Sequence, residues 1–182
     1  PIFKLPKELL IGEKNRGFYH LMEALNFERV TLVGVGGFRR MFEEIVDWVK
    51  VAERDGKPLA KNLIVRQKLA DFATKIEIAY MIFWRTASML DQDLDPSVES
   101  SILKLVSTEM ARDMAEIGMQ ILGPYGQLTE QSEYTPIRGL VSRGYLDAVS
   151  ATIGAGTSEI QRNIIAQRGL GLPRVASKGG KK

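Results

Sequence analysis

Glu28 is a carboxylate set within an apolar helical stripe. It lies three residues after Leu25 and four before Leu32, so helical periodicity places all three side chains on one face. Removing a carboxylate from water is costly unless it is paired, and burial raises the pKa of such a group. A general base that works near neutral pH needs such a shift. Spacing alone leaves two interpretations open: a catalytic base, or a structural glutamate paired with Arg29 or with an arginine of a neighbouring helix.

A second candidate for chemistry is the glycine-rich stretch Thr152-Ile-Gly-Ala-Gly-Thr-Ser-Glu-Ile-Gln-Arg162. Its two glycines and Thr157 interrupt one helix, and Glu159 gives the next helix an acidic first turn. Backbone N–H groups at such a helix start suit a thioester oxygen or a flavin. Gly156 and Thr157 are equally compatible with a simple turn and helix cap.

The elements that must position these residues are helices. Apolar residues recur at helical spacing over residues 15–54, 59–90, 95–123, 136–152 and 157–168. The first of these helices would be roughly 60 Å long if unbroken. Strand-like alternation is absent from the sequence pattern. We therefore predict an all-α, up-down helical bundle. The core-facing residues of the three long segments are, in order, Leu21, Leu25, Leu32, Val35, Phe38, Phe42, Ile45 and Val49; Leu69, Ala73, Ile76, Tyr80, Phe83, Ala87 and Leu90; and Leu103, Val106, Met110, Met114, Ile117 and Ile121.

Composition excludes several classes of function. The 182 residues are 45% hydrophobic and 26% charged, as in ordinary globular domains. No apolar run approaches the roughly 18 residues of a membrane span, and no signal peptide is visible. The absence of cysteine and the single histidine, His20, exclude a disulfide scaffold and a multi-histidine metal site, and fit a cytoplasmic protein. Three lysines of the tail account for the net charge of +3, so we expect no nucleic-acid surface.

The chain divides into three segments. Residues 1–12 read as the remnant of an upstream β domain or linker, because the chain begins at Pro1 without an initiator methionine. Residues 13–172 form the helical bundle domain, and residues 173–182 are expected to be a disordered basic tail. A truncated longer protein is the simplest explanation of this organisation.

Taken together, Glu28 and the glycine-rich turn resemble the acyl-CoA dehydrogenase family. Leu25-Asn-Phe-Glu-Arg-Val30 is similar to the "LxxER" start of the family's long C-terminal helix. Most members carry the catalytic glutamate immediately before Gly-Thr of the late signature, where this chain has Ala155. A smaller branch, which includes isovaleryl-CoA dehydrogenase, carries it on the long helix and has Gly-Ala-Gly-Thr in the signature. The chain resembles that branch at both places, over about residues 5–174, which is less than half of a usual member.

The resemblance implies α,β-dehydrogenation of an acyl-CoA thioester, with Glu28 removing the α-proton and FAD accepting the β-hydride. The backbone N–H of Ala155 would help to hold the thioester oxygen, which requires no side chain. The other residues implied for the acyl or thioester end of the pocket are Asn26, Phe27, Arg29 and Gly156. Those implied for flavin contact at the helix start are Thr157, Ser158 and Glu159.

The segment 120–126 resembles the family's "QxxGGxG" motif, which reaches the FAD of a neighbouring subunit. Gln120, Gly123 and Gly126 match, whereas Pro124 replaces a glycine. A helix C-cap followed by a tight turn is the alternative interpretation.

The chain departs from the family's second inter-subunit flavin motif, "RxxFG" followed by a glutamine. Asp55 stands in place of the phenylalanine, Arg54 is out of register and Leu63 occupies the glutamine position. Leu146 also replaces the arginine of an "RDA" triplet. The resemblance therefore suggests the base-bearing subunit of an α₂β₂ heteromer, like bacterial members that act on sterol side-chain CoA thioesters. A homotetramer remains the alternative.

An electron-transfer flavoprotein is the implied electron acceptor. Two other functions remain open: a catalytically silent bundle whose role is assembly, with a purely structural Glu28, and an acyl-CoA oxidase that passes electrons to oxygen. The family's flavin and CoA contacts lie largely in an N-terminal helical domain and a middle β domain. We therefore expect the 182-residue chain to be inactive alone.

Overall fold

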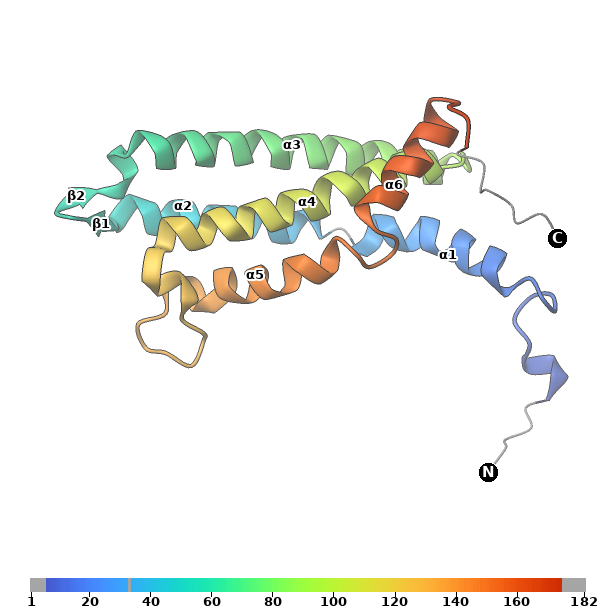
Figure 1. The fold of residues 1–182 in the computed structure, drawn as a ribbon, viewed down its shortest axis with the longest axis horizontal. Coiled ribbons are helices and arrows are strands. Elements are labelled where there is room, and N and C mark those ends of the chain that lie inside the picture. The colour runs from blue at the N-terminus through green and yellow to red at the C-terminus, as the bar shows by residue number, and fades with distance from the viewer. Residues whose placement is uncertain (1–5, 33, 175–182) are drawn as a thin grey trace, which may run out of the picture.

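The computed structural model describes residues 6–32 and 34–174 and shows the predicted all-α bundle (Figure 1). Helices α2 to α5 run alongside one another, α1 projects from one end, and α6 lies across that same end. The α-helices are α1 (Gly17–Leu32), α2 (Val35–Val51), α3 (Leu63–Asp91), α4 (Ser97–Leu122), α5 (Leu140–Ala151) and α6 (Ser158–Ile164). Short helical turns are η1 (Lys7–Leu9), η2 (Leu59–Lys61), η3 (Gly123–Gln127), η4 (Pro136–Gly139) and the π-helical η5 (Ile165–Gly169).

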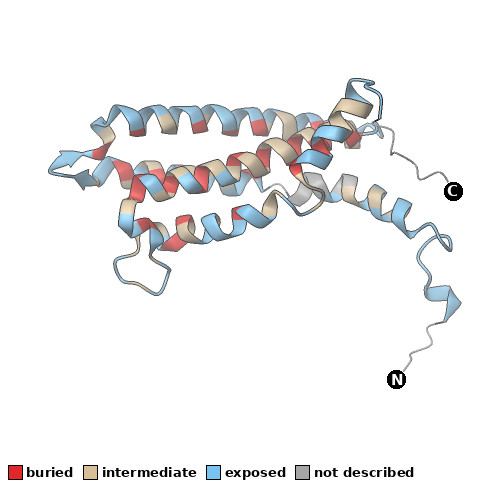
Figure 2. Cartoon of the chain, in the orientation of Figure 1, coloured by how far each residue is buried: buried red, intermediate tan, exposed pale blue. Residues whose placement is uncertain are grey.

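Helix α4 is the central element of the bundle, since it packs against α1, α3, α5 and α6. Most of its predicted stripe is confirmed: Leu103, Met110, Met114 and Ile121 are buried and Ile117 packs against them, whereas Val106 is only half-buried. Buried residues of α2 and α3, such as Ile45 and Ile76, complete two adjoining core clusters. Figure 2 shows this burial concentrated along the inward faces of the packed helices, whereas the beginning of α1 is mostly exposed.

The prediction of one unbroken helix over residues 15–54 is wrong. The structure divides it into α1 and α2, and Gly34 has a non-helical ψ of 64° at the junction. Glycine is the residue that loses most conformational freedom in a helix, and Gly34, Gly36 and Gly37 cluster here. The break means that apolar residues before and after it do not share one continuous face.

Asp55 and Gly56 reverse the chain after α2. Both residues have positive φ, 53° and 69°, which is the backbone of a two-residue hairpin turn. The flanking residues form a small antiparallel ribbon, β1 (Glu53–Arg54) with β2 (Lys57–Pro58), which the helical reading did not anticipate. Helix α3 then begins at Leu63 rather than at residue 59, because the Asn62 side chain accepts hydrogen bonds from two N–H groups of its first turn.

Candidate active site

The side chain of Gln161 holds the turn between α5 and α6 in place. This side chain is fully buried, and its Nε2 donates hydrogen bonds to the carbonyl oxygens of Ala155 at 3.0 Å and Gly156 at 3.1 Å. The C=O and N–H of successive residues in a trans peptide point in opposite directions. With the Gly156 carbonyl directed at Gln161, the N–H of Thr157 is therefore directed away from it.

Ala155 lies in left-handed backbone geometry, with φ of 54°, next to Gly156 with φ of 96°. A residue with a Cβ pays about 1–2 kcal/mol for this conformation. Strained backbone of this kind persists only where its surroundings over-determine it, and it clusters at functional sites. The Gln161 hydrogen bonds are one such constraint on this turn.

Lys104 constrains the same turn from α4. Its side chain is buried, and Nζ donates to the carbonyl oxygen of Thr152 at 3.1 Å. Arg162 of α6 also bonds Glu109 of α4, with 2.7 Å between the two side chains. The turn is thereby anchored on both sides to the central helix.

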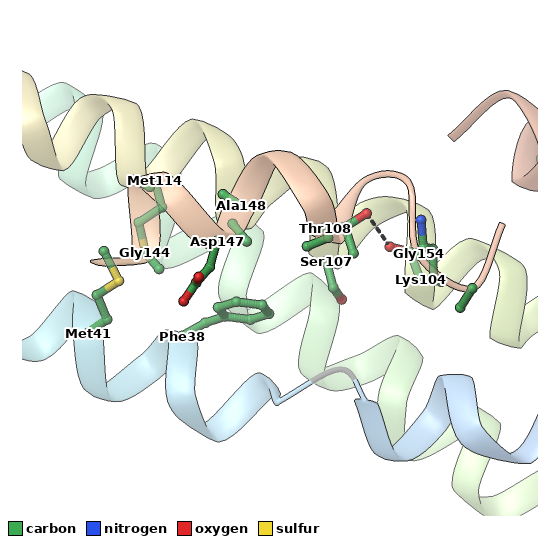
Figure 3. A pocket seen from close by; sticks show the side chains of 14 residues that line it. Phe38, Met41, Lys104, Ser107, Thr108, Met114, Gly144, Asp147, Ala148 and Gly154 are labelled. Carbon is green, nitrogen blue, oxygen red and sulfur yellow. Dashed lines mark hydrogen bonds between the residues drawn. The ribbon is translucent and has the colours of Figure 1, made fainter. Parts of the chain in front are cut away.

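A cavity of about 380 Å³ lies beside this turn, enclosed by α2, α4 and α5 (Figure 3). Gly154 and Ala155 form one end of its lining. Most of the wall is apolar, and Figure 3 shows Phe38 and Met41 projecting from α2 towards α5. The polar side chains in the lining are Lys104, Ser107, Thr108 and Asp147. Its volume lies within the usual range of ligand pockets, about 300–1,000 Å³.

Glu28 does not point into the core, contrary to the prediction from its spacing. Its side chain is exposed on α1. Leu21, on the face expected to be buried, is also exposed. Although α1 contacts α3 and α4, it projects beyond the bundle, so Glu28 and Leu21 stay exposed on this face. Asn26, Phe27 and Arg29 also belong to α1, but their side chains lie outside the described part of the structure.

The first turn of α6 brings Thr157, Ser158 and Glu159 together. The Thr157 hydroxyl accepts a hydrogen bond from the N–H of Ile160 and caps the helix, as the sequence allowed. The backbone N–H of Glu159 and the Thr157 hydroxyl donate to the Glu159 carboxylate, and Arg162 and Lys104 add positive charge, so the pKa of Glu159 lies below its ordinary value of 4.5. At this helix start the Glu159 carboxylate is exposed, whereas Ser158 is buried and the Thr157 hydroxyl is engaged by its own chain.

Gln120, Gly123 and Gly126 lie at the opposite end of α4 from this turn. Lys104 and Gln120 are 16 positions apart in the sequence, which corresponds to about 24 Å along the helix. Gly123 ends α4 with φ of 62°, and Gly126 packs closely on Met119, so both glycines have structural roles. Gln120 is exposed and accepts a hydrogen bond from Lys68 at 2.7 Å. Within one chain these residues and the α6 start are too far apart to share one contact point.

Arg54 is turned towards the same end of α4. Its Nη2 donates to the carbonyl oxygen of Ile121 at 2.6 Å and lies close to Gly123. The arginine that stands out of register for the flavin motif therefore binds a helix end in this chain. Leu146, which replaces the arginine of the family's "RDA" triplet, is largely exposed on α5.

The sequence pattern did not lead us to predict a polar face on α4. Serines and Lys104 recur there at spacings of three and four, beside the apolar stripe that we had identified. This spacing was visible in the sequence as a second helical face of small or polar residues. The residues that share it are Ser97, Ser100, Ser101, Lys104, Ser107 and Thr108.

Residues 15–170 match the family described as acyl-CoA dehydrogenase, C-terminal domain. The chain belongs to this family. Among relatives of this acyl-CoA dehydrogenase domain, the acyl-CoA dehydrogenase FadE26 of Mycobacterium tuberculosis is 32% identical over 94% of the chain and 44% of its own length. Subunit CarC of the caffeyl-CoA reductase-Etf complex of Acetobacterium woodii is 30% identical over 90% of the chain and 41% of its own length.

Solved structures also resemble this acyl-CoA dehydrogenase domain. A chain of the ChsE4-ChsE5 complex from Mycobacterium tuberculosis has a TM-score of 0.79 and 32% identity, over 90% of this chain and 42% of that one. The chain thus spans less than half the length of the relatives that it matches. Within the described residues, no helix is long and apolar enough to cross a membrane, and no group of three metal-binding side chains occurs.

Proposed function

We propose that this domain is the base-bearing part of an FAD-dependent acyl-CoA dehydrogenase that oxidises the α,β bond of an acyl-CoA thioester. The observation that carries the proposal is the Gly154–Thr157 turn, in which Ala155 takes a strained left-handed backbone without an acidic side chain. Because this turn has no side chain that can accept a proton, the catalytic base should lie elsewhere in the sequence. Glu28 is the candidate, since it stands where one branch of the family carries its catalytic glutamate.

The α5–α6 turn has backbone groups suited to a thioester. The Ala155 N–H would donate to the thioester oxygen, and stabilising the negative charge that develops there makes the α-proton easier to remove. Glu28 would take that proton. Asn26, Phe27, Arg29 and Gly156 would line the thioester end of the pocket.

Flavin contacts fall into two groups in this proposal. Thr157, Ser158 and Glu159 would contact FAD at the start of α6. Gln120, Gly123 and Gly126 would approach the FAD of a neighbouring subunit, which agrees with their place at the far end of α4. The flavin supplies the hydride acceptor, and an electron-transfer flavoprotein would be its oxidant.

The exposure of Glu28 fits a base that becomes enclosed by another segment. More than half of each relative lies outside the matched region. The exposed Leu21, on the same face of α1 as Glu28, would then face apolar protein or substrate.

The test is Glu28→Gln in the longest polypeptide that contains this chain, with FAD bound. Loss of a general base is expected to lower kcat by about 10²- to 10⁴-fold. Glu23→Gln, another exposed glutamate of α1, is the matched control and should retain activity. Glu28→Gln with Ala155→Glu should regain part of the lost rate, because a carboxylate would return to the other position. Turnover by Glu28→Gln near the wild-type rate would refute the assignment of Glu28.

A heteromeric assembly is a second part of the proposal. Arg54 bonds the end of α4, and Asp55 occupies a tight turn, so neither offers the flavin contacts of the usual motif. We therefore expect a hetero-tetramer in which a distinct dehydrogenase-like subunit completes the flavin site, with a homotetramer as the alternative. Co-purification of such a subunit would support the heteromer, and a stable FAD-loaded homotetramer would rule it out.

A further inference from the structure

Ser107 carries a buried hydroxyl that has no hydrogen-bond partner in the described part of the chain. The residue is fully buried and lines the cavity between α2, α4 and α5. In Figure 3 its hydroxyl points from α4 in the direction of α2, beside Phe38. A buried hydroxyl without a partner is unfavourable, so this one calls for a partner that comes from outside.

Other hydroxyl groups of α4 behave differently. Ser101 Oγ donates to the Ser97 carbonyl oxygen at 2.8 Å, and Thr108 Oγ1 donates to that of Lys104 at 2.9 Å. This bond to the carbonyl four residues earlier is the common solution for a hydroxyl in a helix. Ser107 does not form this bond with Leu103, so its hydroxyl still has a proton to donate where the residue borders the cavity.

The surroundings select the type of partner. The wall around Ser107 is largely apolar, including Phe38, Met41 and Met114, which suits a hydrocarbon chain. A single hydroxyl satisfies one neutral oxygen, whereas an anion would need more donors. Lys104 already donates to Thr152, and the Asp147 carboxylate lines the same cavity and would repel an anion.

We propose that Ser107 is a specificity residue that hydrogen-bonds a hydroxyl or keto oxygen on the distal part of the acyl group of the CoA thioester. The cavity ends at Gly154 and Ala155, so an acyl chain that starts at this turn would extend along the apolar wall towards Ser107. This inference rests on the proposed dehydrogenase function, which supplies the thioester.

The experiment compares acyl-CoA thioesters of equal length with the FAD-loaded enzyme that contains this chain. One substrate is a plain hydrocarbon, and the others carry a single keto oxygen at successive positions beyond the β-carbon. When the keto oxygen is at the position that reaches Ser107, kcat/KM for the keto substrate should exceed that for the plain substrate by roughly 10- to 100-fold. This is the effect expected when a buried hydroxyl gains a hydrogen-bond partner. Ser107→Ala should abolish most of this preference, whereas Ser101→Ala, equally buried on α4 but already bonded, should preserve it.

Binding to the Glu28→Gln enzyme, followed by flavin absorbance, gives the same comparison without turnover. There Ser107→Ala should remove the difference in Kd between the keto and plain thioesters. If the wild type oxidises plain and keto substrates equally, the dehydrogenase function stands and the role of Ser107 is wrong. The same conclusion holds if Ser107→Ala alters thermal stability but not selectivity, since a protein side chain would then occupy the cavity. If no acyl-CoA is oxidised, the proposed function itself fails and this inference fails with it.

Discussion

The side-chain nitrogen of Gln161 donates a hydrogen bond to the carbonyl oxygen of Ala155 across 3.0 Å. This contact ties a buried residue of α6 to the strained residue of the turn before it. A second bond from the same nitrogen reaches Gly156. Because both carbonyls are held inward, the backbone at this turn presents a defined set of N–H groups to the opposite side.

Gln161→Ala should therefore loosen the turn. Two carbonyl oxygens would lose their donor, which costs about 1–3 kcal/mol in the free energy of unfolding. For a domain of this size the loss corresponds to a fall in Tm of several degrees. Gln161→Glu should be at least as harmful, because a carboxylate offers no donor to either carbonyl. The measurement is thermal unfolding, with Gln131→Ala, an exposed loop glutamine, as the control. Equal Tm values for Gln161→Ala and wild type would show that the turn does not depend on this contact.

Arg54→Ala is expected to destabilise the end of α4. The guanidinium bonds the Ile121 carbonyl at 2.6 Å, but Arg54 is solvent-exposed, so the loss should be about 1 kcal/mol. Flavin affinity of the full enzyme should not change, since the arginine is engaged by its own chain. Thermal unfolding and FAD titration separate the two effects, and Lys61→Ala of η2 serves as the exposed cationic control. A large loss of FAD affinity with unchanged stability would instead indicate a flavin contact.

The helix boundaries show which features the sequence encodes locally. Pro96 before α4, Gly123 after it and Thr157 before α6 act through their own backbone or cap chemistry, and the predicted ranges 95–123 and 157–168 begin or end within one residue of them. The break at Gly34 was missed because the apolar spacing continues across it, while the glycines that weaken the helix do not alter that spacing.

The candidate site was less accessible to prediction. The α5–α6 turn was located by its glycines and cap. The hydrogen bond from Gln161 to Ala155 depends on how α6 packs against the turn, and the spacing of apolar residues does not predict that packing. Glu28 was placed on the core side because helical spacing gives a shared face. Helical spacing does not say how far other segments cover that face, and in the described structure Glu28 stays exposed on it.

The stability contributed by Glu159 should depend on pH. Hydrogen bonds to its carboxylate and nearby positive charge lower its pKa in the folded state below 4.5, so the ionised form is favoured by folding. This contribution is fully present above the unfolded pKa and is lost as pH falls through the lower folded value. Glu159→Gln should therefore reduce Tm slightly at neutral pH, and the difference should vanish in acid. Glu133→Gln, an exposed carboxylate in the loop before η4, is the control. A difference that grows on acidification would contradict the direction of this shift.

Two glycines of the bundle should respond in opposite ways to alanine. Gly37 lies on an exposed face of α2, where an added Cβ would meet nothing within 4 Å. Alanine there should raise the free energy of unfolding by about 0.5–1 kcal/mol, through its higher helix propensity. Gly118 is buried in α4, and a Cβ there would lie 3.0 Å from Cγ1 of Val141 on α5. Overpacking should outweigh propensity and cost about 1–3 kcal/mol.

The pair can be checked by chemical denaturation, because both changes are the same substitution within a helix. Val141→Ala should recover part of the stability lost in Gly118→Ala, since it removes the two methyl groups that a new Cβ would strike. The same change in the Gly37→Ala background should only destabilise, because it opens a cavity beneath α5 with no clash to relieve. Recovery in neither background would mean that α4 and α5 are not packed at Gly118 as closely as the structure places them.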